Sequence, residues 1–310
     1  MFFLATNLAV VVILSRGSCG LSRCITYYLI SMAVTDLLVI ITSVILNRIV
    51  GIYFPFTMLS ITPVCSLSFV IIYGVRDCSV GVTVAFTFDR FVAISCQKLR
   101  TKYCAKKTAV LVIGAVCVLG CVRNIPWYFI YEPSFKINNT PYSCSVKLIF
   151  YTLPMWAAFD WILAILTPWL PLILIFLLNA LTIRNILAAN GARRRIRVHS
   201  DRENHSDPEI ERRRKSIILL FTISGSFILL YLLYFINIIY VRIAKVTYFS
   251  GSTSDESAFF LEESGYMLQF LSSCINPFIY TGTQSKFRQN LKDGLKYPLA
   301  PIIRLLKYKS

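Results

Sequence analysis

The sequence predicts an all-α protein, a bundle of seven transmembrane helices followed by a short amphipathic eighth helix. Only 15% of the 310 residues are charged, against about a quarter in an average soluble domain, and 56% are hydrophobic. Apolar stretches of about 18 residues or more recur along the chain. The basic residues gather in alternate connections between these stretches, so the net charge of +17 indicates membrane topology. This pattern excludes a soluble enzyme and a nucleic-acid-binding protein.

Seven apolar segments are expected to cross the lipid. All but the first exceed the roughly 20 residues that a hydrocarbon core about 30 Å thick requires. The first is short, and neither a charged leader nor a cleavage site precedes it, so we expect an outer amino-terminal piece to be missing. The segments are Met1–Leu14, Thr26–Ile49, Val64–Ser95, Thr108–Ile130, Trp156–Leu187, Ser216–Val241 and Ala258–Thr281.

The distribution of Lys and Arg predicts the orientation. If the amino terminus lies outside, 25 of the 32 basic residues fall on the inner side and six on the outer side. The carboxyl terminus is then cytoplasmic. Asn138 opens an Asn-Asn-Thr glycosylation sequon, which this topology places on the second outer loop. Residues 1–283 form the transmembrane domain, with a truncated first helix, and residues 284–310 form the amphipathic helix and the cytoplasmic tail.

Ionisable side chains inside the spans are candidates for function, because burying a charge in lipid is costly. Asp36 lies in an apolar part of the second span and must find a partner, a water or a cation. Asp89 and Arg90 close the third span. Arg76 and Asp77 lie near its middle, and two interpretations remain open. The two charges neutralise each other structurally, or Arg76 faces an outer cavity and binds an anionic group of a ligand.

The last span and the segment after it have distinct patterns. Pro277 removes a backbone hydrogen bond, and the neighbouring Asn276 can satisfy the freed carbonyl, so this helix should be deformable. Beyond it, apolar residues recur at helical spacing on a basic background. This segment should therefore lie flat on the inner leaflet, in contact with membrane lipids; its apolar residues are Phe287, Leu291 and Leu295.

In this order the motifs resemble those of the rhodopsin-like (class A) G-protein-coupled receptors. They are Asn7 in the first span, Ser31-Met32-Ala33-Val34-Thr35-Asp36 in the second, Cys65 with Cys144, Asp89-Arg90-Phe91, Pro171 in the fifth span, and Asn276-Pro277-x-x-Tyr280. The resemblance implies a plasma-membrane receptor that passes the signal of an extracellular small molecule or peptide to a heterotrimeric G protein. Two further stretches, Arg123–Tyr128 and Phe221–Ile223, resemble the orphan group that includes receptors for aromatic amino acids and related peptides.

The resemblance also implies roles for individual residues. Cys65 and Cys144, both on the oxidising side, would form a disulfide. A sodium-and-water pocket, the one expected cofactor site, would be lined by Asp36, Ser79, Asn276 and either Ser272 or Ser273. The activation switch would comprise Asp89, Arg90, Phe227, Tyr231, Asn276, Pro277 and Tyr280.

The sixth span departs from the family pattern. Tyr231 stands where a Trp is common, and Leu233 where a kinking Pro is common. The basic run Arg212–Lys215 stands where an acidic residue often holds Arg90. Two opposed expectations follow. Repulsion of Arg90 predicts a weak resting latch and raised basal signalling, whereas the missing proline predicts a stiff helix that switches poorly.

The expected ligand pocket comprises Ile72, Arg76, Tyr231 and Tyr234. Ile72 stands where amine-binding receptors have an Asp, which disfavours an amine ligand. The outer loop Pro126–Tyr131 is aromatic and would suit an apolar or aromatic ligand. The alternative is an aromatic belt at the membrane interface, for Trp127 and Trp156 in particular.

Two other functions compete with a signalling receptor. One is a receptor-like protein whose signalling is lost or constitutive, and the other is a small membrane transporter, although the sequence has no internal repeat. We find no nucleophile–base arrangement and no metal-binding cluster, so neither an enzyme nor a metal site is expected. The polar third cytoplasmic loop, Asn190 to Glu211, is expected to be mobile and mostly unfolded.

Overall fold

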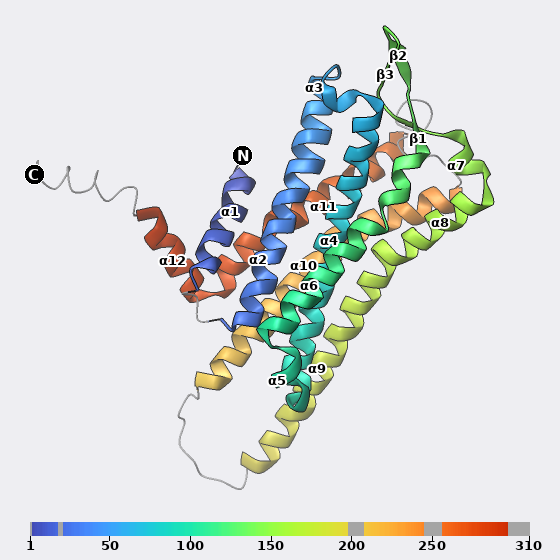
Figure 1. Cartoon of the computed structure of the whole chain (residues 1–310). Helices are drawn as coiled ribbons and strands as arrows, with labels where there is room; N and C mark the ends of the chain where they lie inside the picture. The colour runs from blue at the N-terminus through green and yellow to red at the C-terminus, as the bar shows by residue number, and fades with distance from the viewer. Residues whose placement is uncertain (1, 18–20, 198–207, 245–255, 297–310) are drawn as a thin grey trace, which may run out of the picture.

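The structure, a computed structural model, describes residues 2–17, 21–197, 208–244 and 256–296. Long helices run side by side in a bundle, and two small β-ribbons lie at one end of it (Figure 1). We call this end the disulfide end, because Cys65 and Cys144 meet there. The opposite end, where the third long helix finishes, is called the Asp89 end. The predicted all-α fold is confirmed.

The helical elements follow the chain from one end of the bundle to the other. They are α1 (Phe2–Ser15), α2 (Arg23–Val39), the π-helix η1 (Ile40–Val50), α3 (Gly51–Tyr53), the 3-10 helix η2 (Met58–Ser60), α4 (Thr62–Ser95), α5 (Gln97–Tyr103), α6 (Lys106–Val122), the 3-10 helix η3 (Ile125–Ile130), α7 (Leu148–Thr152), α8 (Pro154–Ala164), the π-helix η4 (Ile165–Trp169), α9 (Leu170–Arg197), α10 (Pro208–Ala244), α11 (Glu256–Thr283) and α12 (Ser285–Lys296).

Five helical runs in the described part of the chain are long and apolar enough to cross a membrane, and they correspond to the second to sixth predicted spans. The first helix, α1, has only 14 residues. The seventh, α11, has 28 residues but is more polar. Its polar side chains Glu262, Gln269 and Asn276 are buried inside the bundle. Because these polar side chains face the inside of the bundle, they lower the mean hydropathy of the helix without being exposed to lipid.

Two of the spans contain π-helical segments that the periodicity of the sequence did not predict. The second span continues from α2 into η1, and the fifth runs through η4, which contains Pro168. A π-segment widens the helix locally and turns the side chains beyond it, and such bulges are frequent at functional sites. Both segments lie on the disulfide side of their spans, so they shape that half of the bundle.

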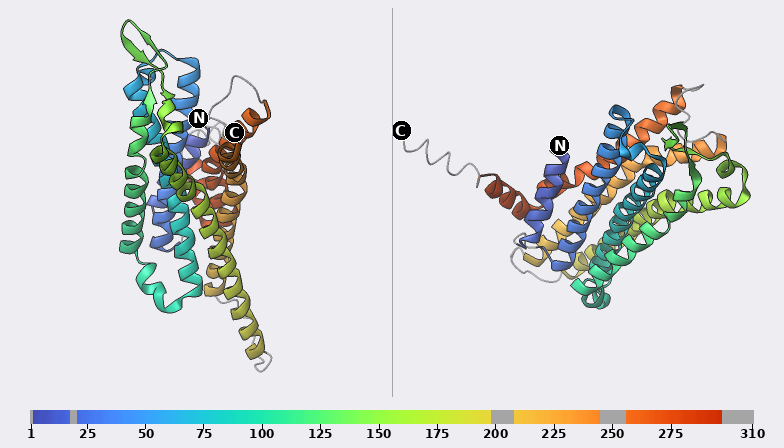
Figure 2. Two further views of the ribbon diagram at one scale, coloured as in Figure 1. Left: turned by 90° about the vertical axis from the view of Figure 1, so that its right-hand side faces the viewer. Right: turned by 45° about the horizontal axis from the view of Figure 1, so that its top comes forward.

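The buried apolar residues form three clusters. The largest lies toward the Asp89 end and includes Leu29, Phe86 and Tyr280, from α2, α4 and α11. The second lies around Tyr231, and the third is small and lies beneath the β-ribbons. Figure 2 shows the helices from two further sides, with the polypeptide of the ribbons capping the disulfide end.

The connections differ from the sequence-based expectation in two places. The predicted second outer loop folds into strands β1 (Tyr131–Glu132), β2 (Phe135–Ile137), β3 (Thr140–Tyr142) and β4 (Ser145–Val146), in which β1 pairs with β4 and β2 with β3, both antiparallel. Asn138 and Asn139 form the tip of the β2–β3 hairpin, with φ angles of 48° and 61°. Asn tolerates this left-handed conformation better than most residues, which is why the chain can turn there.

The third predicted cytoplasmic loop is the second difference. The expectation that residues 190–211 are unfolded is wrong at both ends, because α9 continues to Arg197 and α10 begins at Pro208. The polar composition of residues 190–211 predicted an unfolded loop, although the helices of the two neighbouring spans continue into it. The middle of this loop, the tail after Lys296 and the side chains of the predicted latch residues Arg212 and Arg213 lie outside the described residues.

Candidate functional site

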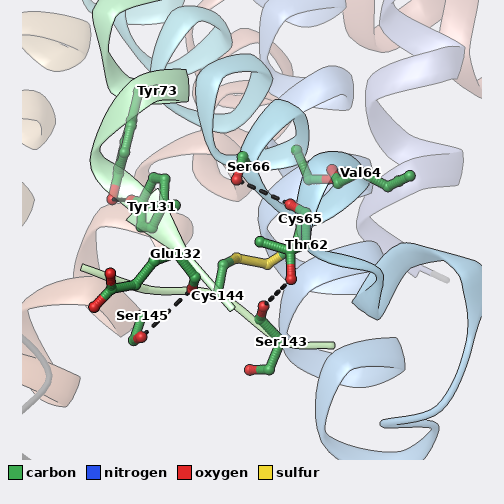
Figure 3. Close-up of a disulfide and its surroundings, with 11 residues drawn as sticks. Thr62, Val64, Cys65, Ser66, Tyr73, Tyr131, Glu132, Ser143, Cys144 and Ser145 are labelled. Atoms are coloured by element: carbon green, nitrogen blue, oxygen red, sulfur yellow. Dashed lines mark hydrogen bonds between the residues drawn. A yellow bond between two sulfur atoms is a disulfide. The ribbon is translucent and has the colours of Figure 1, made fainter. Parts of the chain in front are cut away.

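The disulfide joins the start of α4 to the outer connection between β3 and β4. Cys65 and Cys144 are bonded, with their Cα atoms 6.2 Å apart, which confirms the predicted pair. The Thr62 hydroxyl donates to the Ser143 carbonyl at 2.8 Å (Figure 3). The Ser143 amide donates to the Ser60 carbonyl at 2.6 Å. These contacts hold the β-ribbons against α4.

A cavity lies in the disulfide half of the bundle, below the ribbons. Its walls come from α4, the end of α6, η3, the ribbons, α7, α8, η4, α10 and α11. The residues that line it are Tyr73, Arg76, Asp77, Asn124, Trp127, Tyr131, Val146, Phe150, Asp160, Leu163, Ala164, Thr167, Pro168, Tyr234, Asn237, Ile238 and Tyr266. The lining is mostly aromatic and aliphatic with a few convergent polar groups, as in sites for small ligands.

Arg76 is the cationic side chain of this cavity. It is only 6% exposed, and its Nη1 donates to the hydroxyl of Tyr234 at 3.4 Å. The guanidinium carbon lies 5.7, 5.8 and 5.6 Å from the ring centres of Tyr73, Tyr234 and Tyr266. These rings stabilise the cation through their faces. The Nε of Arg76 is buried without a hydrogen-bond partner, and Arg76 forms no ion pair with a residue that the structure describes.

Asp77 has its own partners, which decides between the two interpretations of the Arg76-Asp77 pair. Arg123, just after α6, donates through Nε and Nη2 to Oδ2 of Asp77, both at 2.6 Å. Asn124 donates to the same oxygen, and Arg123 also donates to Thr167 in η4 at 3.0 Å. Arg123 therefore neutralises Asp77, and this polar network joins α4, α6 and η4. Arg76 is left to face the cavity.

The predicted ligand-pocket residues divide into two groups. Arg76 and Tyr234 line the cavity, whereas Ile72 and Tyr231 do not. Ile72 is buried on α4 outside the cavity wall, and Tyr231 lies one turn below Tyr234 in the second apolar cluster. Ile72 and Tyr231 were included in the predicted ligand pocket because of their positions along the helices. Position along a helix does not specify how deep into the bundle the cavity extends.

The aromatic residues of the outer loop also divide. Trp127, Tyr131 and Phe150 line the cavity. Trp156 packs on Phe150, with ring centres 6.2 Å apart, but does not line it. The cavity interpretation therefore holds for Trp127, Tyr131 and Phe150, and the aromatic belt stays a prediction for Trp156.

A second polar cluster lies deeper in the bundle, around Asp36 of α2. Its Oδ1 accepts from the hydroxyl of Ser79 at 3.0 Å, and its Oδ2 accepts from the amide of Asn276 at 2.7 Å. Ser273 is a further hydrogen-bond partner. Asn7 of α1 donates to the carbonyl of Ser273 at 3.1 Å. The structure thus brings the predicted pocket residues together from three helices, α2, α4 and α11, with Ser273 in the place left open between Ser272 and Ser273.

At the Asp89 end, Asp89 and Arg90 form a buried ion pair within α4. The Nε of Arg90 donates to Oδ2 of Asp89 at 3.0 Å, and Nη2 contacts the same oxygen. The Nη1 of Arg90 donates to the hydroxyl of Ser216 on α10 at 3.3 Å. Among the side chains of α10 that the structure describes, the partner of Arg90 is therefore a neutral hydroxyl.

The remaining predicted switch residues lie on α10 and α11, in the two large apolar clusters and the helix turns beside them. Phe227 and Tyr231 stack on each other on α10, with ring centres 4.2 Å apart. Tyr280 of α11 packs against Phe287 of α12. The hydroxyl of Tyr280 is buried and has no hydrogen-bond partner. Pro277 lies inside α11, one turn before Tyr280.

Sequence reasoning missed several residues of these sites. Arg123 stood near the end of a predicted span and was counted among the outer basic residues, although a charge beside an apolar run was a signal for a buried partner. Cys24 was not among the predicted site residues, but its thiol donates to Oδ1 of Asp89 at 3.1 Å. No signal in the sequence pointed to Tyr73 or Tyr266, because aromatic residues are common in every span.

Comparison with known proteins identifies one family. The sequence pattern of the family described as 7 transmembrane receptor (rhodopsin family) matches residues 6–280, which is most of the chain. No curated protein matches the chain significantly. Within the described residues, no group of three or more His, Cys, Asp or Glu side chains is arranged to hold a metal ion.

Proposed function

Because the chain belongs to the rhodopsin family of seven-transmembrane receptors, which are multi-pass plasma-membrane proteins that couple extracellular signals to G proteins, we propose that the cavity around Arg76 is its ligand site. The chain is a G-protein-coupled receptor, and nothing favours a transporter. The family match does not distinguish subgroups, so the narrower resemblance to receptors for aromatic amino acids stays a prediction. We assign no catalytic activity to the receptor itself.

The observation that carries the ligand-site proposal is the buried cation of Arg76. A charge in a low-dielectric site is stabilised strongly by an opposite charge that displaces water. The guanidinium presents an unused donor, Nε, in a cavity with aromatic walls. A ligand that carries one carboxylate or similar anionic group on an aromatic or apolar body complements both features. The acidic side chain of Asp160 also lines the cavity, which disfavours a polyanion.

The response to such ligands is expected to depend on Arg76. In cells, Arg76→Ala should abolish the G-protein response to those members of a panel of aromatic carboxylates that activate the native receptor, with surface expression retained. Arg76→Lys should weaken it about tenfold or more, because Lys keeps the charge but loses the fork of donors. The neutral amides of the same compounds should be inactive on the native receptor.

Arg48→Ala provides the matched control for this experiment. Arg48 pairs with Glu263 at 2.9 Å and its guanidinium carbon lies 5.5 Å from the ring centre of Tyr266, but it does not line the cavity. Its removal should leave the carboxylate dependence intact. An unchanged response of Arg76→Ala, or equal activity of acids and amides, would contradict the assignment.

The Asp36 cluster is proposed to bind a sodium ion in the resting receptor. One carboxylate and the hydroxyls of Ser79 and Ser273 supply the oxygen ligands that a hard monovalent cation prefers, and they converge inside the bundle. Asn276 donates to the other carboxylate oxygen and orients it. The ion would supply a positive charge that compensates Asp36 when the helices are in this arrangement.

Sodium should therefore stabilise the native receptor by binding its folded state. Replacing choline chloride by sodium chloride at constant ionic strength should raise the melting temperature of the purified receptor, and Asp36→Asn should remove the effect. Ser79→Ala should weaken it, whereas Ser66→Ala, at a buried serine near the start of α4, should not. A sodium effect that survives in Asp36→Asn would place the ion elsewhere.

The switch is proposed to lie below the sodium cluster. Arg90 rests on Asp89 and Ser216, and activation would free it toward the G protein as α10 moves. The buried, unpartnered hydroxyl of Tyr280 supports this proposal, because a buried hydroxyl without a partner is costly and would gain a hydrogen bond by rotating. Phe227 and Tyr231 would transmit the movement of α10 from the cavity.

The orientation is also a proposal. The amino terminus and the disulfide end would face outside, and the Asp89 end and the carboxyl terminus would face the cytoplasm. The oxidised Cys65–Cys144 pair and the exposed position of Asn138 in the β2–β3 hairpin suit an outer surface, where that sequon would be glycosylated. On the other side, α12 buries Phe287 and exposes Lys286 and Arg288, which suits contact with anionic lipids.

A further inference from the structure

We infer that the thiol of Cys24 is a positioning residue of the activation switch, because it holds Asp89 in the geometry that retains Arg90. This inference rests on the proposed resting role of the Asp89–Arg90 pair. The thiol lies on α2, a helix to which neither switch residue belongs. The contact therefore makes the switch depend on the packing of α2 against α4.

The first turn of α2 places Cys24 on the inner face of that helix. Ser22 caps the helix, and its hydroxyl accepts a hydrogen bond from the amide of Ile25 at 3.4 Å. The cap fixes where the helix begins and so the direction in which Cys24 points. The side chain is only 1% exposed. Tyr28, one turn later on the same face, packs against Phe86 of α4 with ring centres 6.3 Å apart.

The two carboxylate oxygens of Asp89 accept hydrogen bonds from residues of two different helices. Oδ2 accepts from the Nε of Arg90, and Oδ1 accepts from the Sγ of Cys24 at 3.1 Å. A carboxylate has lone pairs on both oxygens, and one left unsatisfied in a buried site is costly. With both oxygens occupied, the carboxylate cannot rotate without losing a hydrogen bond. The plane of the carboxylate, and with it the position of Arg90, is thereby held.

A second thiol acts on the backbone of the same residue. Cys104, between α5 and α6, donates through Sγ to the carbonyl of Asp89 at 3.7 Å. Burial, followed by the negative charge of Asp89, raises the pKa of the Cys104 thiol to about 11, so it remains a donor at neutral pH. Arg90 is the charged group on the other side. The surroundings of Asp89 thus consist of one cation and two thiol donors, together with the phenol of Tyr28.

Removing the donor should release Arg90 and raise signalling without ligand. A hydrogen bond to a charged group changes an equilibrium by roughly tenfold. Cys24→Ala should therefore increase ligand-free G-protein activation about five- to tenfold at equal surface expression. Cys24→Ser, which keeps a donor, should stay near the native level. Cys117→Ala, at a half-buried cysteine of α6 that does not contact Asp89, is the control and should change nothing.

Two further comparisons separate positioning from packing. In the Asp89→Asn background, Cys24→Ala should add no further increase, because the carboxylate it acts through is gone. The pair Cys24→Thr and Cys24→Val has nearly equal volume and differs in the hydroxyl donor, so only Cys24→Val should signal more without ligand. If Cys24→Ala fails to reach the cell surface, this pair still tests whether the hydrogen-bond donor at position 24 limits ligand-free signalling.

A thermal double-mutant cycle on purified receptor provides a readout that needs no G protein. Cys24→Ala and Asp89→Asn should each lower the melting temperature, and their effects should be less than additive. Where Asp89→Asn itself raises ligand-free signalling, equal basal signalling of Cys24→Ala and native receptor would overturn the inference, as would equal signalling of Cys24→Thr and Cys24→Val. Full additivity in the thermal cycle would overturn it in every case. If the cycle is non-additive but no variant, Asp89→Asn included, raises ligand-free signalling above the native level, the positioning contact stands and the proposed resting role of Asp89 fails.

Discussion

Arg123→Ala is expected to destabilise the receptor by about 3–5 kcal/mol, because it leaves the buried carboxylate of Asp77 without its cation. The contact of Arg123 with Thr167 is lost at the same time, so η4 loses its polar link to α6. The expected result is a sharp fall in surface expression and in the melting temperature of the purified receptor.

The double variant Asp77→Ala, Arg123→Ala tests whether the uncompensated charge is the cause. Removing both partners of a buried ion pair costs far less than removing one, so the double variant should recover much of the stability lost by the single variant. Lys147→Ala is the control, because this half-buried lysine lies at the same end and its ammonium donates to the carbonyl of Phe129 rather than to a carboxylate of the described residues. A double variant as unstable as Arg123→Ala would assign the loss to packing instead.

Loss of the disulfide is the second large effect. The bond closes a loop between residues separated by 79 positions, and restricting the unfolded chain over such a loop contributes about 4.5 kcal/mol in the chain-entropy account. Cys65→Ala and Cys144→Ala should each reduce surface expression severely. They should also abolish the ligand response, because the ribbons that the bond holds contribute Tyr131 and Val146 to the cavity wall.

The double variant Cys65→Ala, Cys144→Ala should be no worse than either single variant, since each removes the same bond. Cys121→Ala, at an exposed free cysteine of α6, should be neutral. The melting temperatures of the four purified variants, compared with that of the native receptor, test these expectations. Single variants as stable as the native receptor, or a double variant much less stable than both, would contradict this account.

Much of the fold follows from local sequence pattern. Apolar runs longer than the lipid core predicted the second to sixth spans, because a buried backbone in lipid must form helix. The same rule did not predict the π-segments η1 and η4. A widened turn arises from packing against neighbouring helices and from Pro168, and it leaves the apolar composition of the run unchanged.

The candidate sites were predicted unevenly for a similar reason. Asp36 stands in an apolar run, so a partner was required, and the structure supplies Ser79 and Asn276. Arg76 and Asp77 are adjacent, and their sequence positions left open whether they neutralise each other or Arg76 faces a cavity. Adjacent residues on a helix point in directions about 100° apart, and only the position of α6 decided that Arg123 would reach Asp77.

By itself the sequence determined the receptor family, the membrane-spanning character of the chain and the pairing of Cys65 with Cys144, because these depend on composition and on motifs in a fixed order. Only the tertiary structure decided which charges are compensated. It directed Arg123 to Asp77, left Arg76 among three tyrosines, and placed the Cys24 thiol on Asp89. Each of these outcomes depends on how helices distant in sequence rotate against one another, and the energy of a buried charge is set by the groups that this rotation places within a few ångströms of it.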